Sequence, residues 1–189
     1  MRPQLYFFAG ELFNQPTEDR LAGLQSLLTL LLSITPPEAP WRETLIALEP
    51  ELNYNENLET EYSRLFILAV PSVPAQPFGS YWLENDQCLF GPSTLEVKNM
   101  MASHGIEVTQ NSGLLPDHIV SELEFMAYLA GQDEQETWQT QQQLFEQHID
   151  RWMPQFTEAL RAANPAPIAY YRLAADYLDQ LIAWEQQQW

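Results

Sequence analysis

Apolar residues recur every three to four positions along most of the chain, which is the spacing of one face of an α-helix. The clearest run is Leu21, Leu24, Leu28 and Leu31, which follows Thr17 as a predicted helix N-cap and ends at a proline pair. Alternating apolar and polar runs, which are typical of strands, are few. The pattern therefore predicts an all-α protein.

Helix boundaries are also visible in the pattern. Three more residues are predicted N-caps, and two prolines fit first helical turns. The N-caps are Ser93, Asp133 and Asn164, and the prolines are Pro116 and Pro165. Pro154 lies inside a long helical pattern at residues 138–160, so we expect it to kink that helix. Two stretches interrupt the helices.

The first interruption is an aromatic, proline-rich loop at residues 71–92. It follows a helix whose buried stripe is predicted to contain Tyr62, Leu65, Phe66 and Ala69. The prolines remove backbone donors, and the aromatic side chains of the loop need another surface to cover them. The loop either packs over its own domain as a lid or lines a groove for an extended peptide.

The second interruption, residues 104–115, contains two glycines and no apolar stripe, and we place a hinge there. It separates an N-terminal helical part, residues 1–103, from a C-terminal helical part, residues 116–189. Neither part looks able to bury its apolar faces alone. We expect a monomer, and a dimer that exchanges the C-terminal helices is the alternative.

The chain is strongly acidic, with 26 Asp and Glu against 8 Lys and Arg and a formal net charge of -18. Nucleic acid is not an expected partner, because phosphate binding needs clustered Lys and Arg. A basic peptide or protein would suit this charge, although acidity can also serve solubility alone.

Composition also bears on the compartment. Cys88 is the only cysteine, which excludes an intramolecular disulfide and any CxxC zinc or redox motif. The N-terminal apolar run is too short for a signal-peptide core, and no apolar stretch approaches the roughly 20 residues of a spanning helix. We therefore expect a cytoplasmic protein that does not insert into a membrane.

Catalytic motifs are sparse: GxSxG, HExxH, Walker and GxGxxG patterns do not occur. Cys88 has the apolar neighbours typical of a small buried residue. His118 and Glu122 could share a helix face, but two groups do not complete a metal site. Near a helix start, His118 is expected to be neutral and bonded to a carbonyl. No cofactor, metal or enzyme activity is expected, and the enzymatic alternative uses Asp117 and His118 as an acid-base pair.

Several motifs follow one another in a definite order across the middle of the chain. They are E-Y-x-x-L-F before the prolines, P-x-G-S-Y-W, L-F-G-P-S-T, and P-D-H-x-x-x-E-L-x-F-M with a downstream H-x-x-x-W. Their order and spacing resemble the TorD/DmsD family of redox-enzyme maturation chaperones. One departure is Phe78, where the family's loop has Tyr or Trp. The matching residues are Glu61, Tyr62, Leu65, Phe66, Pro77, Gly79, Ser80, Tyr81, Trp82, residues 89–94, residues 116–118, Glu122, Leu123, Phe125, Met126, His148 and Trp152.

The resemblance implies a TorD-like helical bundle with two helical parts joined by a hinge, and a function without catalysis. Such chaperones bind an apo molybdoenzyme and its twin-arginine signal peptide, assist cofactor insertion and delay export. The implied partners of this chain are a molybdopterin oxidoreductase precursor and its twin-arginine signal peptide. The alternative is an acidic helical adaptor for another protein client.

A twin-arginine signal joins two basic residues to an apolar segment, so its receptor needs an acidic rim and an apolar trough. The candidate arginine partners are Glu84, Asp86, Asp117 and Glu122. The expected binding residues are Tyr62, Leu65, Phe66, Pro77, Phe78, Ser80, Tyr81, Trp82, Asp117, His118 and Glu122. Sequence alone leaves open whether they share one surface.

Overall fold

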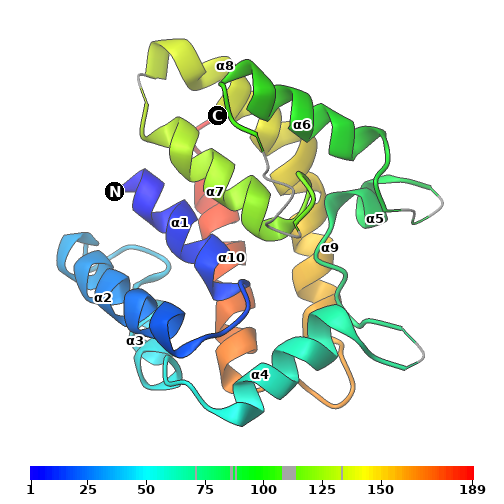
Figure 1. Cartoon of the computed structure of the whole chain (residues 1–189). Coiled ribbons are helices and arrows are strands. Elements are labelled where there is room, and N and C mark those ends of the chain that lie inside the picture. Colours follow the sequence, from blue (N-terminus) through cyan, green and yellow to red (C-terminus); the bar gives the residue numbers. More distant parts are fainter. Residues whose placement is uncertain (71, 86, 88, 108–113, 133) are drawn as a thin grey trace.

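The computed structural model describes residues 1–189 apart from 71, 86, 88, 108–113 and 133. The described residues form α-helices, short 3₁₀ and π turns and loops, as Figure 1 shows. The α-helices are α1 (Arg2–Leu12), α2 (Glu18–Ile34), α3 (Arg42–Leu48), α4 (Glu56–Tyr62), α5 (Gly79–Leu83), α6 (Pro92–Ser103), α7 (Ile119–Ala130), α8 (Glu134–Leu144), α9 (Asp150–Arg161) and α10 (Ala169–Glu185). In this described part of the chain, no helix combines the length and apolarity needed to cross a bilayer. The all-α prediction is confirmed.

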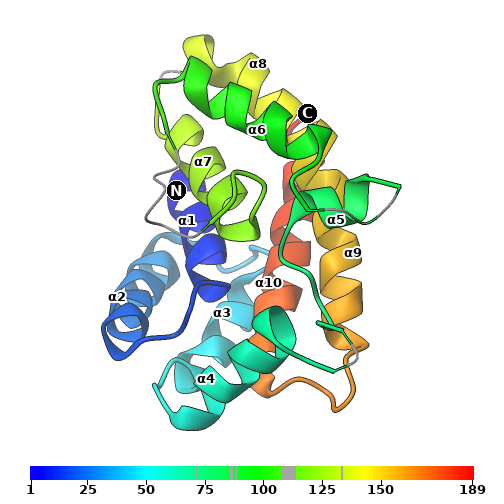
Figure 2. The ribbon, with the colours of Figure 1, turned by 45° about the vertical axis from the view of Figure 1, so that its right-hand side comes forward.

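Helix α1 lies among the other helices and packs against α2, α7 and α10 (Figures 1 and 2). Its Leu5, Tyr6 and Phe8 are completely buried, so the helix is apolar on several sides rather than along one stripe. Gly10 of α1 faces α7, and a Cβ there would lie 3.4 Å from the Leu123 Cβ, an ordinary van der Waals contact. The N-terminal and C-terminal helices therefore share one core.

Aromatic rings fill the core where the end of α4 meets α9 and α10. The Phe66 ring centroid lies 5.4 Å from that of Tyr62, 5.9 Å from that of Phe156 and 5.3 Å from that of Tyr171. Each such contact stabilises a core by roughly 1 kcal/mol beyond simple burial. The predicted buried stripe is confirmed for Tyr62, Leu65 and Phe66.

The stripe does not reach Ala69, and that prediction is wrong. Helix α4 passes into a π turn at Ser63–Ile67, where the Leu68 N–H donates to the Ser63 carbonyl at 2.8 Å. The chain then becomes extended at Leu68. Ile67 and Leu68 are consequently 59% and 78% exposed.

The capping prediction at Thr17 is confirmed. Its hydroxyl accepts a hydrogen bond from the Arg20 N–H at 3.2 Å. Glu18 and Asp19 follow in the first turn, where the helix dipole favours negative charge. Another predicted cap, Asp133, lies outside the described residues.

Two other capping predictions are wrong, because a distant carboxylate supplies the acceptor. Ser93 lies in the first turn of α6 and donates its N–H to the Glu84 carboxylate at 3.0 Å. Helix α10 begins well after Asn164, and its N-cap residue Ile168 donates its N–H to the Glu61 carboxylate at 3.1 Å. A helix start bound by a remote side chain has no signature in the neighbouring sequence.

The long helix expected around Pro154 is interrupted before the proline. Helix α8 ends at Leu144, a π turn occupies Phe145–Ile149, and α9 then runs through Pro154. Proline lacks the N–H that would bond one turn back, to Asp150, and the π turn lies directly N-terminal to that residue. The π turn contains His148, which is buried against α7.

Most of the predicted hinge, residues 108–113, lies outside the described residues. On its N-terminal side, Gly105 ends the turn after α6 with a φ of 72°, a left-handed conformation that glycine adopts at little cost. The hinge itself stays a prediction.

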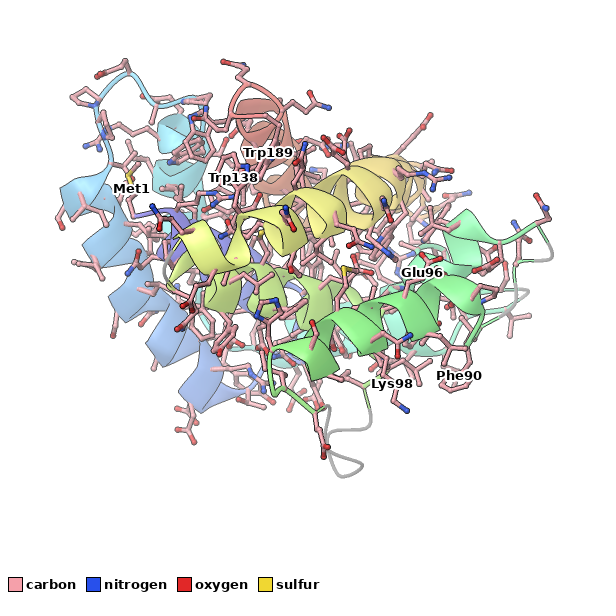
Figure 3. The ribbon with its side chains drawn as sticks, turned by 90° about the horizontal axis from the view of Figure 1, so that it is seen from above. Met1, Phe90, Glu96, Lys98, Trp138 and Trp189 are labelled. Atoms are coloured by element: carbon pink, nitrogen blue, oxygen red, sulfur yellow. The ribbon has the colours of Figure 1, made fainter. Side chains whose placement is uncertain are left out.

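The two ends of the chain meet at the side of the molecule that Figure 3 views from above. Arg2 donates through Nε to both carboxylate oxygens of Glu185, each at 3.1 Å. The rings of Trp138 and Trp189 lie side by side with centroids 4.2 Å apart (Figure 3). These contacts tie α1, α8 and α10 together.

Candidate functional site

Two segments far apart in sequence meet just before α5 and α7. Gly79 donates its N–H to the Asp117 carbonyl at 2.8 Å, and Ile119 donates its N–H to the Pro77 carbonyl at 2.9 Å. The motif P-x-G-S of the aromatic loop and the motif P-D-H are thereby paired. The aromatic loop was predicted to contain no helix, and that prediction is wrong, because pairing sets up the short helix α5.

Asp117 holds the start of α5. It is completely buried, and its Oδ2 accepts a hydrogen bond from the Ser80 N–H at 2.8 Å, while its Oδ1 has no hydrogen-bond partner among the described residues. Asp117 and Pro116 were predicted to lie in the first turn of α7, which is wrong, because α7 begins at Ile119. A buried carboxylate oxygen without a donor is an acceptor for an incoming N–H group or water.

His118 is the N-cap of α7. Its Nδ1 accepts a hydrogen bond from the Val120 N–H at 3.2 Å. The Phe78 ring packs edge-to-face against it, with ring centroids 5.1 Å apart. Burial lowers the pKa of His118 to about 4, so the ring is neutral, as predicted. We predicted that the ring bonds to a carbonyl. That prediction is wrong for Nδ1, which accepts a hydrogen bond from a backbone N–H. A neutral ring with Nδ1 as acceptor carries its proton on Nε2.

A second buried polar group lies one turn along α7. The Glu122 Oε2 accepts from Trp152 Nε1 at 3.0 Å, and burial raises the pKa of Glu122 well above its usual value. His148 lies between two carboxylates, with Nδ1 3.7 Å from Glu122 Oε1 and Nε2 3.5 Å from Glu96 Oε2. Burial lowers the pKa of His148 to about 4. The raised pKa of Glu122 and the lowered pKa of His148 both favour the uncharged form of these side chains.

Gly79 leaves room for the buried cluster of Asp117, His118, Glu122, His148 and Trp152. A Cβ at that position would lie 3.0 Å from Trp152 Nε1 and 3.2 Å from Glu122 Oε1. Pro77 and Ser80 on either side are also buried. A side chain at this position would therefore press on Trp152 and Glu122, and glycine lets the loop lie against α7 and α9 without that crowding.

Five of the expected apolar binding residues separate into two groups. Tyr62, Leu65 and Phe66 lie in the aromatic core with 8%, 0% and 6% exposure, so they offer little area to a peptide. Tyr81 and Trp82 are half-buried on α5, with ring centroids 5.0 Å apart in an edge-to-face arrangement. Contact with a peptide is available from the second group, whereas the first group fills the core between α4, α9 and α10.

Of the four expected arginine partners, the three that the structure describes are not exposed. Asp117 and Glu122 are completely buried. Glu84 is half-buried, and its carboxylate accepts the Ser93 N–H at the start of α6. Asp86 lies outside the described residues. Glu84 therefore has a structural role that the sequence did not indicate.

Glu84→Ala is expected to lower the free energy of unfolding by about 1 kcal/mol, because the Ser93 N–H loses its acceptor. Glu84→Gln keeps a side-chain oxygen and should lose less. Urea denaturation of the three proteins at one pH measures the difference. Equal stability of all three would show that the carboxylate does not hold the helix start.

Three buried residues of this region, Gly79, His148 and Trp152, and the exposed Glu96 beside them were not among the expected binding residues. His148 and Trp152 are four positions apart in H-x-x-x-W, a spacing that places both on one helix face. That spacing could have identified them. Glu96 gave no such indication, because it is one of several exposed acidic side chains and only the fold brings α6 beside the π turn (Figure 3).

The cluster offers hydrogen-bond acceptors without a partner cation. Among the described residues, Lys and Arg form their ion pairs with other carboxylates than Asp117 and Glu122. The same residues contain no group of three or more His, Cys, Asp and Glu side chains placed to hold a metal ion. Neutral His118, with Nδ1 already engaged, is poorly matched to general-base work near pH 7. The arrangement suits binding of N–H donors better than catalysis.

Known proteins with similar sequences include members of the family that the order of the motifs indicated. The chaperone DmsD of Salmonella typhimurium, named for Tat proofreading, is 31% identical over 157 residues, which cover 79% of this chain and 74% of that protein. The chaperone protein TorD of a Psychrobacter species is 28% identical over 170 residues, covering 82% of this chain and 76% of the relative. A redox enzyme maturation protein from Archaeoglobus fulgidus has a similar fold, with a TM-score of 0.62, 22% identity and coverage of 98% and 94%.

The predicted family is confirmed by a match that spans most of the chain. Residues 12–158 fit the sequence profile of the family described as "Nitrate reductase delta subunit". This range contains α2 to α8 and most of α9, and with them the whole buried cluster. The chain therefore belongs to the nitrate reductase delta subunit family, together with its TorD and DmsD relatives.

Proposed function

We propose that this protein is a cytoplasmic chaperone that binds the precursor of a molybdopterin oxidoreductase and its twin-arginine signal peptide. It holds the precursor for cofactor insertion and delays export. Membership of the family and the names of the relatives support a chaperone. The observation that carries the binding site is the buried Asp117, whose Oδ1 has no hydrogen-bond partner among the residues that the structure describes.

In this proposal the arginine side chain of the signal peptide donates to Asp117 Oδ1, and Phe78, Tyr81 and Trp82 contact the apolar residues that follow. A guanidinium suits this role, because its N–H donors bind carboxylates with strong charge-assisted hydrogen bonds. Asp117 is covered by the loop, so the loop has to shift for the guanidinium to enter. Two backbone hydrogen bonds pair the loop with the start of α7, and both can reform after such a shift.

The test is binding of a twin-arginine signal peptide to the purified protein. Asp117→Asn keeps an oxygen for the Ser80 N–H and removes the charge. We expect it to weaken peptide binding by roughly tenfold, as for loss of one charge-assisted hydrogen bond, and to flatten the salt dependence. Titration calorimetry at two salt concentrations measures both effects.

A matched control separates the site from the overall charge. Glu38→Gln also removes one carboxylate, but from an exposed turn between α2 and α3, and should leave affinity nearly unchanged. His118→Ala should weaken binding more than it lowers the melting temperature. Unchanged affinity in Asp117→Asn and His118→Ala, with reduced melting temperatures, would show that the pair is only structural.

Two other functions are decided by what the protein retains in cells. An acidic adaptor would recover a client other than an oxidoreductase, and an enzyme would turn over a small molecule without any client. Co-purification from anaerobically grown source cells, followed by identification of the bound chain, distinguishes these cases. We expect a monomer bound to one precursor, and light scattering across a concentration series measures this.

A further inference from the structure

Two adjoining hollows flank α1 and share the side chain of Phe7, and we call them together the α1 groove. The hollow between α1 and α7 measures about 470 Å³ and includes Tyr128. The hollow between α1 and α2 measures about 770 Å³ and includes Leu27 and Leu30. Phe7, Leu30 and Tyr128 are 44%, 46% and 41% exposed. The groove therefore presents large apolar side chains that the fold leaves uncovered.

Carboxylates stand beside this apolar floor. Glu11 lines the hollow next to α2, and Glu124 lines the hollow next to α7. Arg20 Nε lies 3.4 Å from Glu11 Oε2. Burial raises the pKa of Glu124, and the neighbouring Glu11 carboxylate raises it further. Glu11 is already paired with Arg20, and Glu124 forms no ion pair among the described residues, so another cation beside Glu124 would be stabilised.

We propose that the α1 groove binds an amphipathic helix of the client protein, with apolar side chains in the two hollows and a Lys or Arg beside Glu11 and Glu124. Binding of an amphipathic helix in an apolar groove is a recurrent mode of peptide recognition. A second copy of this chain is a poor occupant, because it would bring a further formal charge of -18 to an acidic surface. That the helix comes from the client rests on the function proposed above.

The position of the groove along α7 supports the client as the source. Glu124 and Tyr128 follow His118 by six and ten residues, which corresponds to roughly 9 and 15 Å along a helix axis. An extended chain covers such a distance in about three to five residues. A client whose signal peptide is held near His118 can therefore reach the α1 groove with residues close to that peptide.

Gly23 provides a substitution that fills the groove and spares the fold. It lines the hollow between α1 and α2, and an added Cβ there would meet nothing within 4 Å. Gly23→Lys would place a long cationic side chain in the groove at a helix position that favours lysine over glycine. Gly23→Ala is the matched control, since it changes the same helix position and adds only a methyl group.

The experiment measures fluorescence anisotropy of two designed helical peptides. Each has leucines at positions i, i+3, i+4 and i+7, and one carries an Arg where the other carries a Glu. Wild type and Gly23→Ala are expected to bind the Arg peptide at least tenfold more tightly than the Glu peptide. Gly23→Lys is expected to lose roughly tenfold in affinity for the Arg peptide, because charge and shape are both opposed.

Equal affinity of wild type and Gly23→Lys for the Arg peptide would overturn the proposal. A wild-type dimer in light scattering that Gly23→Lys abolishes would also overturn it, since a second copy would then occupy the groove. A twin-arginine signal peptide titrated in parallel separates this proposal from the previous one. If wild type binds the Arg peptide but not the signal peptide, the groove stands and the proposed function fails. If only the signal peptide binds, the groove fails.

Discussion

Replacing Arg2 by Met is expected to destabilise the protein by about 3–5 kcal/mol, because it leaves the Glu185 carboxylate buried without its cation. Glu185 is completely buried, and Arg2 donates to both of its oxygens and to Gln141 Oε1. The guanidinium carbon also lies 5.4 Å from the Trp189 ring centroid. For a chain of this length, such a loss lowers the melting temperature by roughly 10 °C.

Two controls identify the cause of this loss. Arg2→Met combined with Glu185→Leu removes both charges, and should recover much of the stability because no charge remains buried. Arg20→Met removes a more exposed pair with Glu11, which is expected to cost less than about 1 kcal/mol. Urea unfolding of the four proteins measures these values. A single Arg2→Met variant as stable as Arg20→Met would contradict the expected importance of the terminal contacts.

The helices could be predicted from spacing because burial of apolar faces decides them. Leu21, Leu24, Leu28 and Leu31 are buried as the stripe indicated. Helix starts were predictable only where the acceptor is local, as at Thr17. Where Glu84 or Glu61 reaches across the fold to bind a helix start, the neighbouring sequence indicates a wrong residue, and where Asp117 does so it indicates no helix.

The candidate site shows the same division. The motifs P-x-G-S and P-D-H were both found in the sequence, and the structure pairs them through two backbone hydrogen bonds. Burial could not be predicted, because an amphipathic pattern does not indicate whether an aromatic such as Phe66 lines a groove or fills a core. The sequence also placed Asp117 in its own helix, whereas it holds the start of α5. Its partner was 37 residues away, beyond the reach of local reasoning.

Acidification is expected to destabilise the protein through its two buried histidines. Burial lowers the pKa of His118 and of His148 to about 4, below the unfolded value of 6.5. Between these pH values the unfolded chain binds more protons than the folded chain, so stability is present above pH 6.5 and is lost as the pH falls toward 4. Each histidine contributes a loss of up to roughly 3 kcal/mol over this range.

Glu122 acts in the opposite direction. Burial raises its pKa above the unfolded value of 4.5, so its contribution to stability is greatest at low pH and is lost as the pH rises through the folded pKa. Glu122→Gln keeps an acceptor for Trp152 Nε1 and cannot ionise, so it should be more stable than wild type at pH 7.5. That difference should shrink as the pH falls toward 4.5. His148→Gln should instead make the loss on acidification shallower.

Unfolding free energies from urea titrations at several pH values between 4.5 and 7.5 measure both effects in the same three proteins. The variants are compared with wild type at each pH, so the titration of the many exposed carboxylates cancels. A Glu122→Gln curve that runs parallel to wild type would show that Glu122 titrates as an ordinary carboxylate. A parallel His148→Gln curve would show that His148, whose Nδ1 lies 3.7 Å from Glu122 Oε1, titrates as an ordinary imidazole. Convergence of the first curve toward wild type, with flattening of the second, is the expected result, because burial favours the neutral form of both groups.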